Sequence, residues 1–544
     1  MIPPADSMYI IGPGPLPQIS AAEAGNKAWN LMRMAAAGLR VPAGFVLPTK
    51  WTEWIKTDLE SGGELRRALQ GGIQTLEKLT SLSFGSPWRP LLVSVRSGAA
   101  VSMPGMMETI LNIGLNASSV QGLIRQTGNP RQAWDCYRRL IQSYGEVVCG
   151  LPAGPFEQAV ARAVTKAGEA NDRRLDFRTL KTLSQELTDL FEDLTRTRFP
   201  ADPYEQLEQA ARAVIRSWDA PKAVAYRRLH HMDDAGGTAV TVQLMVFGNA
   251  GGQSGSGVGF SRDPATGDRG LYLDFCLNGQ GEDIVSGRRR TEEHEGRRAM
   301  LPGVWRDIEA AARSLETLFR DAQDFEFTVQ NGTLYLLQAR DAKRSDWAAL
   351  RIAADLVKEG LIQPSEAVQR LGGIDLARVS RTRFRSVPTQ PLARGEPASI
   401  GVASGAAAFD SAATQRMAKT GTPVILVRGE TTTADISGIA AASGILTSLG
   451  SRTSHAAVVA RQMGKVCLVG CAGLEIGADG RSCRLGGQTI REGDLLSLDG
   501  NQGTVYRGKL QIITQRPTRE LKAIAHWRSQ EQRGIGAARL RGRI

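Results

Sequence analysis

Short apolar segments typical of β-strands alternate with helical segments along most of this chain. A helix is expected after Lys27, a strand at residues 91–95, helices between residues 131 and 217, and another strand at residues 238–247. A second alternating region, punctuated by glycine, covers residues 398–508. The pattern predicts packed α/β layers, and 544 residues exceed what one hydrophobic core usually holds. We therefore predict an α/β multidomain protein of about two to four domains.

Composition and turn signals divide the chain into four expected segments. They are a large α/β region with a helical insertion at residues 1–345, a helical linker at 346–397, a small β/α domain at 398–510 and a basic tail at 511–544. Residues 515–544 contain eight Lys and Arg against two Asp and Glu, so much of the net charge of +12 lies in this tail. A charged tail of this kind is usually solvated. We therefore expect no nucleic-acid partner.

Cysteine usage and hydropathy indicate the compartment. Six cysteines in 544 residues do not suggest a disulfide framework and favour a reducing cytoplasm. Cys467, Cys471 and Cys483 lie near His455 in sequence, but their spacing matches no common zinc motif, and buried thiols are expected. No apolar run approaches the ~20 residues of a membrane span, and residues 1–19 do not resemble a signal peptide. A cytoplasmic protein without a membrane partner is expected.

The dipeptide Asn331-Gly332 strongly indicates a β-hairpin. Two registers differ in which side chains share a face. A loop of two residues would put the acidic side chains of the first strand on the face opposite the polar side chains of the second. A loop of three residues, 330–332, would pair Val329 with Thr333 and put both polar sets on one face. We prefer the three-residue loop because it sorts apolar from polar side chains more completely.

In the preferred register Asp324 is opposite Gln338, and Glu326 and Arg340 share their face. The other face is apolar and consists of Phe325, Phe327, Val329, Tyr335 and Leu337. Two carboxylates and an amide oxygen suit Mg²⁺, a hard cation that prefers oxygen ligands. The alternative is the solvated polar face of a surface hairpin.

Three further segments could contact phosphate. A glycine-rich run at residues 248–257 joins two apolar strands and would expose backbone N–H groups to phosphate, with Gly251 and Gly255 as candidates. A flexible surface turn is the alternative for this run. Arg96 lies at a strand end and suits bidentate phosphate contact. Lys27 lies near a helix start, where it can contact phosphate or face solvent.

His455 is the histidine in the most unusual setting. A strand ends near Thr447, small residues follow, and helix formers begin after Thr453 and Ser454, which are good N-cap residues; Gly464 ends the helix. His455 would therefore lie in the first helical turn, where N–H groups and the macrodipole favour an anion. Neutral imidazole is a competent nucleophile there, since its unperturbed pKa is ~6.5. The alternative is a structural histidine at a helix start.

Taken together, these segments resemble the pyruvate phosphate dikinase family. The resemblance runs from about residue 25 to residue 508 in the family's order, and it rests on RSGAAVSMPGMMETILNIGLN, VFGNAGGQSGSGVGFSRDPATGD, NGQGEDIVSG, FEFTVQNGTLYLLQAR and TSHAAVVARQMGK. It implies an ATP-grasp nucleotide-binding domain in residues 1–345. It also implies a swivelling β/β/α phosphohistidine domain in residues 398–510.

The resemblance implies roles for individual residues. His455 matches the phosphorylated histidine, and Thr453, two positions before it, matches a threonine that is phosphorylated for regulation in the plant enzymes. The residues at the family's nucleotide and metal positions are Lys27, Arg96, Asp324, Glu326, Gln338 and Arg340. Among these, Glu326 and Gln338 are the expected ligands of Mg²⁺.

The resemblance also implies a reaction. In that family histidine attacks the β-phosphoryl group of ATP and releases AMP. The pyrophosphoryl-histidine gives its outer phosphate to inorganic phosphate, which releases pyrophosphate and leaves phosphohistidine. The expected protein is thus a phosphotransferase that uses Mg²⁺, ATP and inorganic phosphate, and a homodimer is one expected assembly.

The sequence departs from the family in three places. The family's GGMTSH is GSRTSH here, with Ser451 in place of a glycine, and Leu449 stands where an arginine is usual. The family's GGKG is here GNKA, with Asn26 in place of a glycine. Both changes lie beside residues that would handle phosphate. The third departure is length, because the family's barrel for phosphoenolpyruvate or pyruvate would follow residue 510, and we therefore expect that barrel on a separate polypeptide.

Three functions remain open. The first is a phosphotransferase that forms phosphohistidine and passes the phosphate to pyruvate or another acceptor on a separate barrel, which requires His455 to travel between two sites. The second is a non-catalytic ATP-binding regulatory protein, and the third is a kinase for a different small acceptor. We favour the first because His455, Glu326 and Gln338 are all present.

Overall fold

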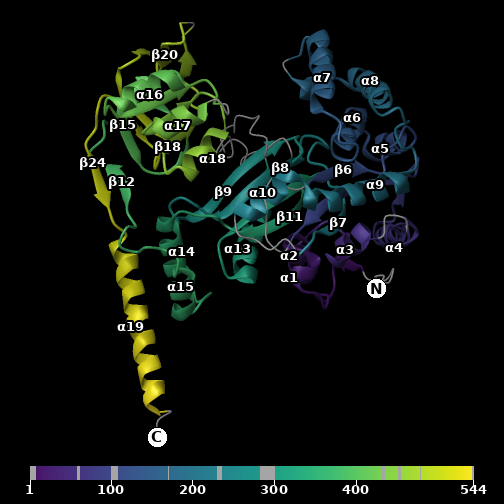
Figure 1. Ribbon diagram of the computed structural model, residues 1–544, viewed down its shortest axis with the longest axis horizontal. Coiled ribbons are helices and arrows are strands. Elements are labelled where there is room, and N and C mark those ends of the chain that lie inside the picture. The colour runs from purple at the N-terminus through teal and green to yellow at the C-terminus, as the bar shows by residue number, and fades with distance from the viewer. Residues whose placement is uncertain are drawn as a thin grey trace. The chain divides into compact units, whose positions relative to one another are not determined.

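A computed structural model gives the fold of the chain (Figure 1), and it describes residues 8–57, 62–99, 108–169, 171–229, 236–281, 301–431, 435–450, 455–477 and 479–541. Helices and strands are mixed throughout, which confirms the predicted α/β multidomain class. The chain divides into two compact units. The first comprises residues 1–254 and 328–340, and the second comprises residues 255–327 and 341–544. The finer segment boundaries expected from sequence stay predictions.

The first unit is built around an antiparallel sheet in the strand order β1-β2-β7-β5-β6. Its strands are β1 (Tyr9–Ile11), β2 (Gly44–Leu47), β7 (Ala239–Leu244), β5 (Val93–Gly98) and β6 (Thr109–Ile113). The central strands β7 and β5 are rich in valine and almost fully buried, as suits strands inside a sheet. They confirm, within a few residues, the strands expected at 91–95 and 238–247. A short parallel pair, β3 (Ser83–Phe84) and β4 (Pro90–Leu91), precedes β5.

Ten α-helices within the described residues complete the first unit. They are α1 (Ala21–Ala24), α2 (Asn26–Ala36), α3 (Lys50–Thr57), α4 (Gly62–Thr80), α5 (Ser119–Thr127), α6 (Pro130–Val147), α7 (Ala153–Ala167), α8 (Phe177–Thr195), α9 (Pro203–Arg216) and α10 (Pro221–Leu229). The last six include the helices predicted between residues 131 and 217. Helix α6 starts where it does because the Asn129 side chain accepts a hydrogen bond from Gln132 N–H at 3.0 Å, and Pro130 tolerates the first helical position.

A four-stranded sheet in the order β11-β10-β8-β9 carries the predicted hairpin. Its strands are β8 (Gly255–Arg262), β9 (Arg269–Leu277), β10 (Gln323–Gln330) and β11 (Thr333–Asp341), and α13 (Pro302–Phe319) precedes β10. Strands β8 and β9 pair antiparallel.

In the second unit, the segments before and after the small domain at residues 393–507 pack together, and we call them the linker body. It contains α14 (Asp346–Lys358), α15 (Pro364–Arg370), α19 (Thr518–Arg541) and a two-stranded antiparallel ribbon of β12 (Arg381–Phe384) and β24 (Ile512–Gln515). Ile524 of α19 is fully buried in a core shared with Leu350 and Leu356 of α14. The expected solvated tail is therefore wrong at its start, because the segment forms a helix that packs on α14 and α15.

The domain that follows has three layers. An eight-stranded sheet in the order β13-β23-β22-β15-β16-β17-β18-β14 forms the middle, with β15 to β18 parallel. Its strands are β13 (Ala393–Arg394), β14 (Glu396–Ser399), β15 (Val402–Ala408), β16 (Val424–Arg428), β17 (Gly444–Thr447), β18 (Val466–Val469), β22 (Leu495–Asp499) and β23 (Thr504–Arg507). The helices are α16 (Ser411–Lys419), α17 (Ile436–Ala441) and α18 (His455–Gln462), and the small sheet is β19 (Leu474–Ile476), β20 (Ser482–Leu485) and β21 (Gln488–Arg491).

Alternation along the strands explains the layers. In β16, Ile425 and Val427 join the core that includes β20 and β21, whereas Leu426 joins the core that includes α17 and α18. Figure 1 shows α16, α17 and α18 together over this sheet, in green. In the part of the chain that the structure describes, no helix is long and apolar enough to cross a membrane.

Candidate functional site

The start of α2 meets the end of β5. Gly25 has φ +73°, and a Cβ there would lie 2.3 Å from the carbonyl oxygen of Gly98. Asn26 N–H donates a hydrogen bond to Ala99 O at 2.9 Å. Lys27, the second residue of α2, is therefore held beside the end of the strand that carries Arg96. Only glycine fits this close approach without strain.

Arg96 lies in β5, which is the fourth strand of the five-stranded sheet and runs between β7 and β6. It is opposite Thr241 of β7 on one side and Thr109 of β6 on the other. Its side chain is half-buried. The backbone of Arg96 is therefore held by strands on both sides. Contact of its side chain with phosphate stays a prediction.

Helix α2 also contacts β11. The side-chain amide of Asn30, which is 7% exposed, donates to Ala339 O at 2.9 Å. Asn30 lies three residues after Lys27, and residues so spaced share a helix face. Ala339 lies between Gln338 and Arg340. In the first unit, the start of α2 with Lys27 thus lies next to the end of β5, the strand of Arg96. The segment with Gln338 and Arg340 is attached to the same helix.

The hairpin turn differs from our expectation. Strand β10 ends at Gln330 and β11 begins at Thr333, so the loop has two residues, not three. Asn331 and Gly332 have φ +50° and +76°, and the type I′ turn of two-residue hairpins requires positive φ at both positions. The predicted pairing of Val329 with Thr333 is therefore wrong, because the Asn-Gly dipeptide fills both corners of the shorter turn.

The base of the hairpin has a different register from the turn. Ala342 N–H donates to Ala322 O at 3.0 Å, so these two residues pair. From Ala322 to Gln330 is 8 steps (330 − 322), and from Thr333 to Ala342 is 9 (342 − 333). One extra residue therefore lies in β11, which makes a β-bulge.

The base register determines which polar side chains share a face. Counting from the Ala322–Ala342 pair, Glu326 falls opposite Gln338 and Asp324 opposite Arg340. The opposite face is buried and consists of Phe325, Phe327, Val329, Leu334, Leu336 and Ala339. Tyr335 and Leu337, which we expected there, are only half-buried. With the two-residue turn alone, these polar side chains would lie on opposite faces. The bulge puts them on the same face, as we predicted.

The glycine-rich run is partly a strand. Gly251, with φ +135°, lies in the turn before β8, and no atom lies within 4 Å of the position that a Cβ would take there, whereas Gly255 is the first residue of β8. A Cβ on Gly255 would meet the Phe275 ring at 2.5 Å, and one on Gly257 the Phe327 ring at 2.1 Å. These strand glycines make room for aromatic rings. The predicted loop at residues 248–257 is therefore too long, and nucleotide contact by Gly251 and Gly255 stays a prediction.

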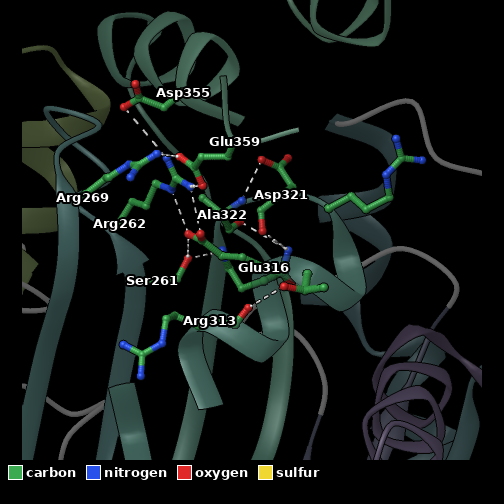
Figure 2. A network of polar contacts seen from close by, with 12 residues as sticks. Ser261, Arg262, Arg269, Arg313, Glu316, Asp321, Ala322, Asp355 and Glu359 are labelled. Atoms are coloured by element: carbon green, nitrogen blue, oxygen red, sulfur yellow. Dashed lines mark hydrogen bonds and ion pairs between the residues drawn. The ribbon is translucent and has the colours of Figure 1, made fainter. Parts of the chain in front are cut away.

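Sequence reasoning missed an ion-pair network beside the hairpin base. Figure 2 shows Arg262, 2% exposed, between Glu316 of α13 and Glu359, which follows α14; the contacts are 2.9 Å and 2.8 Å. Burial alone would lower the pKa of Arg262, but the hydrogen bonds to these carboxylates outweigh burial and raise it. Ser261 Oγ donates to Glu316 at 2.7 Å and accepts from Gln323 N–H at 2.9 Å, which joins β8 to β10. The signal in sequence was only a charged residue at the end of an apolar strand.

The helix that carries His455 is confirmed. Helix α18 begins at His455 and ends at Gln462, shortly before Gly464 with φ +64°. Ala457 and Ala460 of this helix are fully buried against the sheet. The expected caps Thr453 and Ser454, and with them the regulatory threonine, lie outside the described residues, as does Ser451.

The segment before the histidine is anchored at the carboxyl ends of the parallel strands. Leu449 N–H donates to Gly429 O at 2.9 Å, and Ser448 Oγ donates to the same oxygen at 3.1 Å. The Leu449 side chain is 42% exposed. Ligands of open α/β sheets usually bind at this carboxyl edge. An apolar side chain therefore stands at the edge where the family resemblance predicts an arginine.

The cysteines and the possible metal ligands are the candidates for another site among the residues that the structure describes. Within the described residues no disulfide joins the cysteines, and no group of three His, Cys, Asp or Glu could hold a metal ion. Burial raises the pKa of the Cys471 thiol to about 11 and that of Cys483 to about 12, so neither is poised as a thiolate.

Two family models match the chain. The AMP/ATP-binding domain of pyruvate phosphate dikinase matches residues 52–298, and the mobile domain of PEP-utilising enzymes matches residues 421–503. One region of the chain is therefore similar to a nucleotide-binding domain, and a later region is similar to a mobile domain.

Similar curated proteins are pyruvate, phosphate dikinases. That of Clostridium symbiosum is 41% identical over 508 residues, which are 92% of this chain and 58% of the relative. That of Giardia intestinalis is 42% identical over 513 residues, 92% of this chain and 58% of the relative. The chloroplastic one of Flaveria pringlei is 40% identical over 516 residues, 94% of this chain and 54% of the relative. The resemblance to the pyruvate phosphate dikinase family is thereby confirmed, and the chain spans somewhat more than half the length of these relatives.

Proposed function

We propose that this chain is an ATP-dependent phosphotransferase of the dikinase type that forms phosphohistidine at His455. The supporting observation is that His455 is the first residue of α18, after the carboxyl end of β17, inside the region that matches the mobile domain. Amide groups at a helix start favour an anion and disfavour a second positive charge. They would therefore favour a neutral, nucleophilic imidazole before transfer and stabilise the phosphoryl group after it.

The nucleotide would bind in an ATP-grasp domain within residues 1–345. Lys27 lies at the start of α2, which meets the end of β5, and Arg96 lies further back in the same strand. Asn30 ties α2 to the segment of Gln338 and Arg340. Cations on α2 and on the strands next to it suit a triphosphate, with arginine able to contact it in bidentate fashion. Gly251 is a candidate for backbone contact.

The residues of the hairpin fit Mg²⁺. Asp324, Glu326 and Gln338 supply oxygen atoms, which are the donors that Mg²⁺ prefers. We expect Glu326 and Gln338 to hold the ion, which when bound would neutralise charge on the phosphate oxygens.

The reaction balances without a further co-reactant. A ring nitrogen of His455 forms a bond to the β-phosphorus, and the bond from that phosphorus to the oxygen shared with the α-phosphorus breaks, so AMP leaves. An oxygen of inorganic phosphate then attacks the outer phosphorus of pyrophosphoryl-histidine, and the bond from that phosphorus to the bridging oxygen breaks, with the bridging oxygen staying on the histidine-bound phosphoryl group. Pyrophosphate leaves, and phosphohistidine remains. Arg96 and Lys27 would hold the nucleotide while the charge moves.

The acceptor would be pyruvate or another small molecule bound at a second site. The relatives are named for pyruvate and phosphate, and this chain spans somewhat more than half of their length. His455 would then have to visit two sites, so the domain at residues 398–510 would swivel on its linkers. A homodimer and a cytoplasmic location belong to the same proposal.

The test is labelling by ATP. The full chain is incubated with Mg²⁺ and ATP labelled at the β-phosphate, with and without inorganic phosphate, and acid-labile label is mapped by mass spectrometry. We expect label on His455, production of AMP, and pyrophosphate only when phosphate is present. The variant His455→Asn should take up no label, whereas His526→Asn, at an exposed histidine of α19, should label like the wild type.

A second candidate is a non-catalytic ATP-binding regulatory protein. It is favoured by Leu449, whose exposed side chain stands at the carboxyl edge of the sheet where the family has an arginine. ATP binding without label in a folded sample would support it and refute our proposal. Transfer of the label from His455 directly to a small acceptor by this chain alone would instead support a kinase for a different small molecule.

A further inference from the structure

The hairpin depends on contacts at its base that no turn signal encodes. The turn alone would put Asp324 and Glu326 on one face and Gln338 and Arg340 on the other, because a one-residue shift of register moves every side chain to the opposite face. The base register, with its extra residue in β11, brings them together. The contacts that hold the base register therefore decide whether these four polar side chains can contact the same ligand.

Three contacts within the second unit hold that register. Asp321 precedes β10 and Arg344 follows β11, and they form two parallel bonds of 2.6 Å and 2.8 Å. Gln323 Nε2 donates to Asp341 Oδ1 at 2.9 Å, and Ala342 N–H donates to Ala322 O. A slip by one residue would break all of them at once.

The Asp321–Arg344 pair is largely buried and makes further polar contacts. Both side chains are largely buried, with exposed fractions of 11% and 18%. Asp321 also accepts Ala322 N–H at 2.8 Å and lies 3.5 Å from Arg370 Nη1. Figure 2 shows Asp321 and Ala322 next to the network around Arg262, which fixes the neighbouring strand β8 through Ser261. Bidentate arginine–carboxylate pairs specify geometry as well as charge.

We propose that Asp321 and Arg344 are positioning residues: their ion pair holds the base register of the β10–β11 hairpin and so keeps Asp324 and Glu326 on the face of Gln338 and Arg340. Neither residue would contact the ligand itself. The part that concerns Mg²⁺ and ATP rests on the proposed function, whereas the part that concerns register does not.

The test compares Arg344→Gln with Arg351→Gln. Arg351, on α14, lies in the same unit and makes its 2.7 Å ion pair with Asp268, a residue outside the β10–β11 hairpin. Calorimetry measures ATP affinity with and without Mg²⁺. Mg²⁺ should raise the ATP affinity of Arg344→Gln at least tenfold less than it raises that of wild type. The metal-free ATP affinity of this variant should stay within about twofold of wild type. In Arg351→Gln, Mg²⁺ should raise the ATP affinity as much as in wild type.

A second measurement needs no ligand. Amide hydrogen exchange of the nucleotide-free protein should be at least about tenfold faster at residues 323–327 and 338–341 in Arg344→Gln, and unchanged in β7. A full Mg²⁺ gain in Arg344→Gln, an equal loss in Arg351→Gln, or unchanged exchange at the hairpin would each overturn the proposal. If wild type binds no ATP, the proposed function fails, and the exchange result alone decides the positioning role.

Discussion

Replacing Gly257 by alanine should destabilise the four-stranded sheet, because β8 leaves no room for a side chain at this position. A Cβ on Gly257 would lie 2.1 Å from the Cζ atom of Phe327 and 2.9 Å from the carbonyl oxygen of Asp274. The carbonyl belongs to the β8–β9 ladder and cannot move without breaking it. The ring must therefore move.

The size of the effect follows from these distances. Carbon atoms in contact lie about 3.5 Å apart, so the Phe327 ring must shift by about 1.4 Å. The Phe275 ring is stacked on Phe327, at 5.8 Å between centroids and 9° between planes. Because that neighbour limits the movement, we expect a cost of about 3 kcal/mol, at the upper end of the range for overpacked cores.

Amide hydrogen exchange of β8 to β10, measured by mass spectrometry, reports this cost for the sheet itself. A loss of about 3 kcal/mol should speed exchange there roughly hundredfold. The double variant Gly257→Ala/Phe327→Leu should recover most of the loss, because a smaller side chain leaves space for the methyl group. Exchange in Gly257→Ala within about threefold of wild type would refute the packing argument.

Gly252→Ala is the matched control from the same glycine-rich run. Nothing lies within 4 Å of its Cβ position, and its φ is not in the left-handed range. Its stability should change by less than about 0.5 kcal/mol. A fall in ATP affinity without a fall in stability would then indicate that the turn before β8 contacts phosphate.

Three further outcomes are expected. Burial alone would raise the pKa of Asp135, but the neighbouring arginines of α6 outweigh burial and lower the pKa to about 2. The stability that this carboxylate contributes is therefore complete above pH 4 and is lost as the pH falls towards 2. Asp135→Asn should cost about 2 kcal/mol at pH 7, and its denaturation curve should converge on that of wild type near pH 2. Gly25→Ala should weaken ATP binding in calorimetry and lower the melting temperature, because its methyl group would overlap Gly98 O; an unchanged melting temperature would contradict this. Iodoacetamide at pH 8 should alkylate Cys149, the exposed cysteine, far faster than the five buried ones, and mass spectrometry of the folded chain would show equal labelling if burial did not protect them.

Local signals in the sequence were sufficient for the elements that carry the candidate site. Asn331-Gly332 indicated the hairpin, and the small residues before His455 with Gly464 after it indicated helix α18. These features depend on backbone preferences of a few adjacent residues. The position of Lys27 at a helix start was predictable for the same reason.

Features that depend on distant residues were missed. The base register of the hairpin is held by Asp321 with Arg344, and nothing near the turn encodes that pairing. The strand glycines suggested a loop, although their alternation at 255, 257 and 259 matches the spacing of Phe325 and Phe327 and could have indicated glycines packed under rings. We predicted a solvated tail from the positive charge of residues 515–544 alone. The helical spacing of Leu521, Ile524 and Trp527, which pack in the core with α14, was not considered.

The ribbon of β12 and β24 holds the two ends of the small domain close together. Arg385 N–H donates to Gln511 O at 2.9 Å, so the chain leaves the linker body and returns to it at adjacent points. A segment with neighbouring ends is an insertion in the topological sense, and it can be excised or circularly permuted with a short connecting loop. The ribbon should stay with the excised piece, because Phe384 of β12 is buried in a cluster with Val402 and Tyr506. Residues 381–515 are therefore the segment to produce alone.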